Sequence, residues 1–251
     1  MDNLHLLPLI FLISLVLTMV GLGGGLFYSP LFLLLGFPPP VAAATSLFLN
    51  GVAAMSAAIT YWRQKMVDAG TGLALLIAST LAAPAGAMLS PLVPARIYVL
   101  VLACVMLLAA ARMMVGGPPA PRERDGSSLS RIMYGAAAGL AIGIMAGLLG
   151  IGGGIFIVPF LVSLAGMTIK RAAATSTFVV TFSSMSGFLA HVGIHGIDWG
   201  FALPAALVCF LGGQAGSRLM ITRVSPRVIK RIFAVILVLF AARLLQKVLL
   251  P

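Results

Sequence analysis

Charged residues are rare in this sequence. Only 8% of its 251 residues are charged and 61% are hydrophobic, whereas a soluble domain carries about 25% charged residues. Water is therefore excluded as the main solvent. Apolar runs of about 20 residues, long enough to cross a hydrocarbon core as a helix, recur along the chain. We predict an all-α polytopic membrane protein that lies in the lipid bilayer of a bacterial-type inner membrane.

Acidic residues are the scarcest of all. The chain has 5 of them against 16 lysines and arginines, with a net charge of +11. No carboxylate lies in the middle of an apolar run, which argues against a proton relay or a sodium site of the usual kind. Asp68 and Asp198 stand where apolar segments begin and are interpreted as helix N-caps. The basic residues lie in short connections, as the positive-inside rule describes, so no nucleic-acid partner is expected.

Cysteine and histidine are too few for metal or catalytic chemistry. Cys104 and Cys209 lie inside apolar runs and are interpreted as packed thiols. His191 and His195 are expected at the surface, near the outer end of a span, and two histidines alone make no metal site. We find no clustered nucleophile and base and no nucleotide-binding motif. Neither an enzyme, a metal nor a cofactor is expected.

The sequence does contain an internal repeat. The run from Gly21 to Pro30, GLGGGLFYSP, returns 129 residues later as GIGGGIFIVP, and the AAATS motif that ends at Ser46 returns 130 residues later, ending at Ser176. Such repeats are common in secondary transporters. We predict two homologous membrane units, residues 1–115 and 131–251, which a loop rich in glycine, proline and charge joins at 116–130.

Each unit contains five apolar segments. They cover residues 4–20, 26–37, 41–62, 69–90 and 95–115 in the first unit, and 131–149, 155–168, 171–192, 198–217 and 228–249 in the second. The segment after each glycine run is too short to span a bilayer comfortably. It either continues a long broken helix, which gives eight spans and parallel repeats, or closes a re-entrant hairpin that precedes three spanning helices, which gives inverted repeats.

Loop charges favour inverted repeats. The eight-span topology places 8 basic residues on each side of the membrane, whereas the hairpin topology places 13 on the cytoplasmic side. It leaves three outside, Arg96, Arg243 and Lys247, together with both termini. The length of segments 4–20 and 131–149 argues the other way, because both are long for half a hairpin. The eight-span topology therefore stays open as the alternative.

The glycine triplets are the best candidate for a binding site. Glycine weakens a helix and permits unusual dihedral angles, and bare backbone inside a membrane is tolerated only where it is buried or lines a cavity. A helix that starts after the break directs free N–H groups and a positive dipole end into that space, which suits an anion. The alternative is close packing through small residues. The candidate ligands are Gly23, Gly24, Gly25, Leu26, Gly152, Gly153, Gly154 and Ile155.

Polar side chains on the later segments extend this candidate site. Hydroxyl groups there either donate to an anion or bond back to the carbonyl one turn earlier. Asn50 lies one turn after Ser46, on the same face, and its counterpart in the second unit is Val180. Gln214 is a candidate ligand, although an interhelical hydrogen bond is the favoured interpretation. The hydroxyl candidates are Thr45, Ser46, Thr175 and Ser176.

The doubled pairing of Gly-x-Gly-Gly-Gly-x-x-x-x-Pro with Ala-Ala-Ala-Thr-Ser resembles the sulfite exporter TauE/SafE family of membrane permeases, from about Leu4 to Leu250. The resemblance implies transport of sulfite, an organosulfonate or a related small anion. We expect a secondary transporter that works by alternating access. A passive anion channel and an assembly partner of a membrane complex are the alternatives. Transport direction, coupling ion and oligomeric state, a homo-oligomer included, stay open.

The hairpin topology makes a direct labelling prediction. Lys65 and Lys170 lie on the same side of the membrane if the repeats are inverted and on opposite sides if the chain has eight spans. In oriented vesicles, we expect a membrane-impermeant amine reagent to modify both lysines from one face. Modification of the two from opposite faces would restore the eight-span topology.

Overall fold

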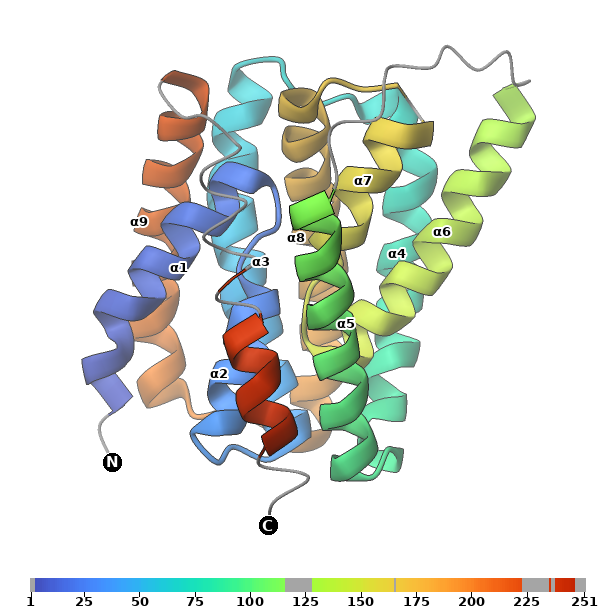
Figure 1. The fold of residues 1–251 in the computed structure, drawn as a ribbon. Helices are drawn as coiled ribbons and strands as arrows, with labels where there is room; N and C mark the ends of the chain where they lie inside the picture. Colours follow the sequence, from blue (N-terminus) through green and yellow to red (C-terminus); the bar gives the residue numbers. More distant parts are fainter. Residues whose placement is uncertain (1–2, 116–127, 165, 223–234, 236–237, 247–251) are drawn as a thin grey trace.

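All secondary structure in the described part of the chain is helical (Figure 1). The computed structural model describes residues 3–115, 128–164, 166–222, 235 and 238–246. The first half comprises η1 (Asn3–Leu6), α1 (Leu7–Val20), α2 (Gly25–Leu34), α3 (Pro39–Arg63), α4 (Ala69–Leu89), η2 (Ser90–Leu92) and α5 (Ala95–Val115). The second half comprises α6 (Ser128–Leu149), α7 (Gly154–Leu164), α8 (Ile169–His195) and α9 (Trp199–Thr222), and residues 238–246 are also helical.

Five of the described helices are long and apolar enough to cross a membrane, namely those of α3, α4, α6, α8 and α9. Buried residues make up 78% and 72% of the apolar windows of α3 and α8, against 39–50% for the other three. The two most buried helices are therefore the central pair, and they pack against each other. Pro39 and Pro40 open α3, where proline's missing N–H costs nothing.

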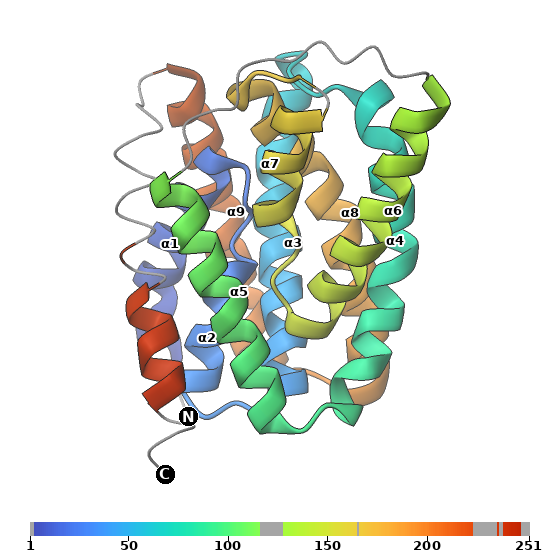
Figure 2. The ribbon, with the colours of Figure 1, turned by 45° about the vertical axis from the view of Figure 1, so that its right-hand side comes forward.

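The first helix of each half packs against the other half of the chain. Helix α1 lies along α9, and α6 lies along α4, while α3 and α8 fill the space between these two pairs (Figures 1 and 2). Helix α3 also contacts α9, and α8 also contacts α4. The two halves are consequently intertwined rather than separate bundles.

Glycines make the contact between α6 and α4 unusually close. Gly135, Gly139, Gly143 and Gly147 recur every fourth residue along α6 and so form one stripe. A methyl group at Gly139 would lie 2.8 Å from the carbonyl oxygen of Leu75, and one at Gly147 would overlap the carbonyl oxygen of Ala83. Gly216 of α9 meets the carbonyl oxygen of Leu15 on α1 in the same way. Small residues let helix backbones approach where no hydrophobic effect drives association.

The broken helices are too short to cross a bilayer. Helix α2 has 10 residues and α7 has 11, so each rises about 15 Å, half of a hydrocarbon core of about 30 Å. In Figures 1 and 2, α1 and α2 both extend from the lower end of the molecule toward the middle, whereas α6 and α7 extend from the upper end. The glycine breaks therefore lie in the interior of the helical assembly.

Several predicted boundaries were wrong. Helix α2 ends at Leu34 rather than at 37, and α7 ends at Leu164 rather than at 168, because Gly36 and Gly166 adopt left-handed φ angles of 89° and 64° that stop the helix. Helix α6 begins at Ser128, inside the segment assigned to the loop 116–130. The predicted segment 228–249 lies mostly outside the described residues.

The glycine stripe predicts a sharp response to added bulk. We expect Gly147→Val to destabilise the protein by about 1–3 kcal/mol, the usual cost of overpacking, because the new side chain meets the carbonyl of Ala83. Gly193→Val is the matched control, since no atom lies within 4 Å of a Cβ placed there. Thermal unfolding in detergent measures both. Equal loss of stability in the two variants would contradict the packing role of Gly147.

Candidate functional site

The two glycine breaks lie against each other. A Cβ at Gly25 would lie 2.7 Å from the carbonyl carbon of Ile151, and one at Gly154 would lie 2.8 Å from the Cα of Leu22. Each contact is the counterpart of the other under the sequence repeat. No side chain fits between the two segments at either position, so the backbone of one break forms a wall of the other.

Two serine hydroxyl groups hold the breaks in place. Ser46 Oγ on α3 donates to the carbonyl oxygen of Gly150 at 2.6 Å, and Ser176 Oγ on α8 donates to the carbonyl oxygen of Gly21 at 2.8 Å. Each serine thus bonds to the other half of the chain, which neither interpretation from sequence anticipated. The carbonyl groups that a helix break exposes gain the partners they need inside a membrane.

Asn50 supplies the acceptor for the amides of α2. Its Oδ1 accepts hydrogen bonds from the N–H groups of both Gly24 and Gly25, the latter at 2.8 Å, and its Nδ2 donates to Ser184 Oγ at 2.7 Å. A Cβ at Gly152 would overlap Nδ2, so the Asn50 side chain also touches the second break. All of these groups are buried. One amide side chain therefore joins α3, α8 and the two breaks.

The second break has no such partner. Val180, the counterpart of Asn50, is fully buried and apolar. Among the described residues, the N–H groups of Gly154 and Ile155 at the start of α7 make no hydrogen bond. The positive end of the α7 dipole lies at these amides. The two breaks therefore differ. The N–H groups at the start of α2 are paired with Asn50 Oδ1, whereas those at the start of α7 have no such acceptor in the part of the chain that the structure describes.

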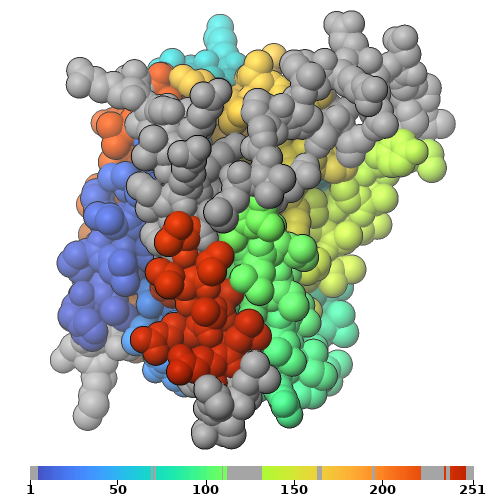
Figure 3. Space-filling view, in the orientation of Figure 1, coloured from blue at the N-terminus to red at the C-terminus, as the bar shows by residue number. Residues whose placement is uncertain are grey.

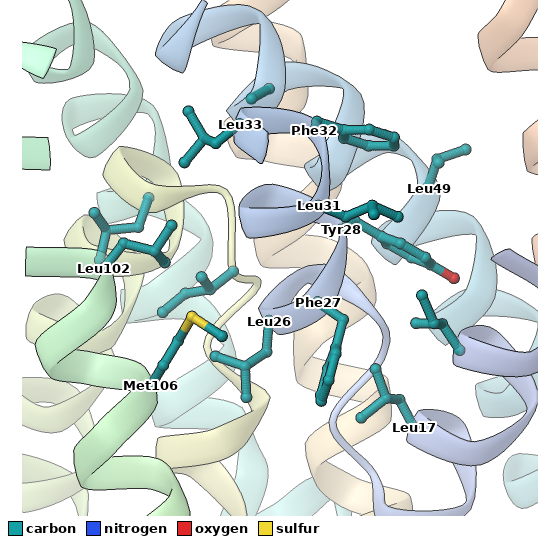
Figure 4. Close-up of a cluster of buried hydrophobic side chains, with 14 of the residues drawn as sticks. Leu17, Leu26, Phe27, Tyr28, Leu31, Phe32, Leu33, Leu49, Leu102 and Met106 are labelled. Carbon is teal, nitrogen blue, oxygen red and sulfur yellow. The ribbon is translucent and has the colours of Figure 1, made fainter. Parts of the chain in front are cut away.

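Protein surrounds α2 on every side. Its residues from Gly25 to Leu33 are all buried, and side chains from α1, α3 and α5 close around them (Figure 4). The helix at residues 238–246 lies between α1 and α5 on the face shown in Figure 3, where Phe240 meets Phe27 edge-on at 5.8 Å. Half-length helices are tolerated at membrane depth only when they are enclosed in this way.

The predicted threonine ligands differ from the serines in their contacts. Thr175 Oγ1 accepts a hydrogen bond at 3.0 Å from the N–H of Asp68, which follows α3, so this hydroxyl serves the connection to α4. Thr45 is buried on α3 beside Ser46. Of the four predicted hydroxyl groups, Ser46 and Ser176 contact the breaks directly.

Gln214 lies away from the breaks. Its Nε2 donates to the carbonyl oxygen of Ser56 at 2.8 Å, and its Oε1 accepts from Thr60 Oγ1 at 3.2 Å. Thr60 stands ten residues beyond Asn50 on α3, a rise of about 15 Å. The interhelical interpretation is correct: Gln214 joins α9 to α3.

A second pair of matched serines, which was not predicted, also makes interhelical bonds. Ser56 Oγ donates to the carbonyl oxygen of Phe210 at 2.6 Å, joining α3 to α9. Ser186 Oγ donates to the carbonyl oxygen of Thr80 at 2.7 Å, joining α8 to α4. The two donors are 130 residues apart, and so are the two acceptors. The sequence repeat could therefore have predicted this pair. These bonds fix the central helices to their outer neighbours.

The surface assignment of His191 was wrong. This side chain is fully buried, and its Nε2 lies 2.8 Å from the carbonyl oxygen of Gly147. The imidazole thereby joins α8 to α6, while the position of the missing Cβ of Gly147 faces Ala83 and Ala87 of α4. The N-cap assignment of Asp198 is correct, because its Oδ1 accepts from the N–H of Gly200 at 3.0 Å. Among the described residues, no group of three histidine, cysteine or acidic side chains could hold a metal ion.

Two pockets open at opposite ends of α3, and the glycine triplets line neither. One, of about 460 Å³, is bordered by Pro39, Arg96 and largely apolar residues of α2 and α5. The other, of about 300 Å³, is bordered by Arg63, Gln214 and Arg218. The 25 residues of α3 between them correspond to about 37 Å of rise. In this conformation the breaks are separated from both pockets by packed side chains.

Comparison with known proteins gives a consistent family. The sequence model of the sulfite exporter TauE/SafE family matches residues 6–244. The chain is 27% identical over 253 residues to the probable membrane transporter protein YunE of Bacillus subtilis (strain 168), with 92% of each chain covered. It is also 27% identical over 245 residues to the probable membrane transporter protein ORF9 of Sinorhizobium sp, covering 96% of this chain and 93% of the relative. No solved structure matches the chain.

The two crossing serine bonds predict a measurable loss of stability. We expect Ser46→Ala and Ser176→Ala to cost about 0.5–1.5 kcal/mol each for the lost bond, and more where the glycine carbonyl stays unpaired. Ser183→Ala is the control, because this buried hydroxyl contacts only the carbonyl of Val180 on its own helix, at 3.4 Å. Thermal unfolding in detergent compares the three. A control that loses as much stability would contradict the special role of the crossing bonds.

Proposed function

The chain belongs to the sulfite exporter TauE/SafE family, and from this premise we propose that it is a secondary transporter of a small sulfur-containing anion. The family and the relatives support a multi-pass membrane transporter. The proposed substrate is sulfite, an organosulfonate or a related anion, carried by alternating access. The proposed location is the bacterial inner membrane.

Inverted repeats are part of this proposal. Arg171 Nη2, at the start of α8, lies 3.6 Å from Asp68 Oδ2, which follows the end of α3. The hairpin topology requires these two connections on one face of the membrane, whereas the eight-span topology separates them. Inverted units that bind substrate at their interface, near the midplane, are a recurrent plan for alternating access.

One observation carries the assignment of an anion. Two successive amides, those of Gly24 and Gly25, converge on a single buried oxygen, Oδ1 of Asn50. Such convergence at a helix N-terminus is the arrangement that binds phosphate, sulfate and carboxylate oxygens. We propose that Asn50 Oδ1 stands where an oxygen of the transported anion binds, and that the anion displaces it.

The start of α7 would supply the other half of the site. The N–H groups of Gly154 and Ile155 are buried donors, and Val180 brings no competing oxygen to them. A sulfite or sulfonate group has three oxygens, enough to bond to both helix N-termini at once. The hydroxyls of Ser46 and Ser176 would add donors when the breaks separate and release the glycine carbonyl groups.

The pockets at the two ends of α3 mark the proposed routes to this site. Each lies at one end of α3, and the glycine triplets line neither. Rocking of one unit against the other would open the breaks to each pocket in turn. The crossing contacts between the triplets would form the barrier that the anion passes.

Flux into proteoliposomes tests the proposed function. We expect purified protein to move sulfite or methanesulfonate under a pH gradient or an imposed potential, with a rate that saturates with substrate concentration. A rate that stays linear would favour the passive channel instead. No flux of any sulfur oxyanion under either driving force would overturn the proposal.

Asn50→Asp separates a structural role from a transport role. The variant keeps the shape and the acceptor for the amides of Gly24 and Gly25, and those donors favour the ionised carboxylate. Two like charges about 4 Å apart repel by about 4 kcal/mol at an effective dielectric constant of about 20, so we expect flux to fall at least tenfold.

The control for this variant is Gln246→Glu, which makes the same chemical change at an exposed position of the helix at 238–246. Its flux should match that of the unmodified chain. Thermal unfolding of Asn50→Asp in detergent checks that the protein still folds. Full flux in a folded Asn50→Asp protein would show that the anion does not meet the amides of α2.

A further inference from the structure

The surface pocket at the ends of α3 and α9 brings together exposed and half-buried polar side chains. It is lined by Ile59, Thr60, Arg63, Gln64, Gln214, Arg218 and Ile221, and has a volume of about 300 Å³. Two arginines and two amide side chains thus face one small space. None of these lining residues is acidic, so the pocket concentrates positive charge and hydrogen-bond donors.

Two hydrogen bonds hold the Gln214 side chain in place at this pocket. Thr60 Oγ1 donates a hydrogen bond to its Oε1, and its Nε2 donates one hydrogen to the carbonyl oxygen of Ser56. A primary amide nitrogen carries two hydrogens, so a second N–H remains at the pocket wall. The two bonds to α3 fix the side chain in place, which lowers the entropic cost of using that N–H to bind a ligand.

The four charged or amide residues of this pocket have no polar counterparts under the sequence repeat. Under the repeat, the positions that correspond to Arg63 and Gln64 are Gly193 and Ile194, and those that correspond to Gln214 and Arg218 are Pro84 and Met88. The related α4–α8 contact therefore has no charge at these four places. Both helix contacts occur in the fold, but only one of them carries these polar groups. Helix packing by itself therefore does not require arginine or glutamine at these positions.

The surroundings place this pocket at the surface of the bilayer. Trp62, next to Arg63, is 54% exposed and stacks on Phe178 with ring centroids 5.3 Å apart. Exposed tryptophan is typical of the headgroup layer. An arginine pair at that depth meets both soluble anions and the phosphates of lipid headgroups.

We propose that this pocket is a second anion site, distinct from the glycine breaks, which binds one oxyanion group between Arg63 and Arg218. The planar guanidinium groups offer paired N–H donors that match sulfite, sulfonate or phosphate oxygens, and the second N–H of Gln214 completes the set. The oxyanion group belongs either to a free anion or to a lipid headgroup phosphate. The site does not depend on the transport proposed for the breaks.

The test compares two variants of equal charge in detergent. Arg63→Gln/Arg218→Gln removes both pocket guanidinium groups, and Lys65→Gln/Lys170→Gln removes two exposed charges outside the lining set at the same end. The full chain is titrated with sodium sulfate against sodium chloride at equal ionic strength, and separately with short-chain phosphatidylglycerol against the matching diacylglycerol. The shift of the unfolding temperature reports binding.

We expect the unmodified chain and the lysine variant to bind sulfate, phosphatidylglycerol or both, and the arginine variant to bind at least about tenfold more weakly, as charge-assisted bonds are lost. Binding of sulfate identifies a free anion, and binding of phosphatidylglycerol alone identifies a headgroup. Equal losses in both variants, or no binding in either titration, would overturn the proposal. Asn50→Asp should keep this binding, so failure of transport and failure of this site are distinguishable.

Discussion

An unpaired peptide group inside a bilayer is so costly that it constrains this whole structure. Two helices break at glycine triplets, and each break leaves amide and carbonyl groups exposed. The crossing bonds from Ser46 and Ser176 pair the carbonyl groups of Gly150 and Gly21, and Asn50 accepts from the N–H groups of Gly24 and Gly25. The two breaks also pack backbone against backbone. The central position of α3 and α8 follows, because these helices carry the side chains that reach both breaks.

Some polar contacts recur in both halves of the chain, and others occur in one half alone among the described residues. Matched serines at 46 and 176, and at 56 and 186, make equivalent bonds in both halves. Asn50 corresponds to Val180 under the repeat, and the arginines and glutamines of the arginine pocket correspond to glycine or apolar residues. These unmatched residues make the two halves chemically different, although each half has a helix that begins at a glycine break.

Much of the fold could be predicted because the bilayer simplifies the problem. Apolar length correctly predicted α3, α4, α8 and α9 as spanning helices, and the repeated glycine runs located both breaks. The favoured topology also made 95–115 a span and 131–149 half of a hairpin, whereas α6 is long enough to span and, in the described part of the chain, the apolar part of α5 covers only Ala95–Leu108. Helix ends were less predictable, since Gly36 and Gly166 end helices inside apolar runs by adopting left-handed φ angles. His191 was misplaced because hydropathy does not show that its ring nitrogen meets the backbone carbonyl of Gly147 on another helix. The glycine stripe of α6, by contrast, can be seen in the sequence.

The sequence by itself determined an all-helical membrane protein, the positions of its two breaks and the residues available to serve them. Only the tertiary structure decided which groups pair. Ser46 bonds to a carbonyl 104 residues away and Ser176 to one 155 residues away, and Asn50 caps a helix 25 residues earlier. Periodicity describes neighbours along one helix, whereas these partners meet because α3 and α8 pack between helices from both halves of the chain.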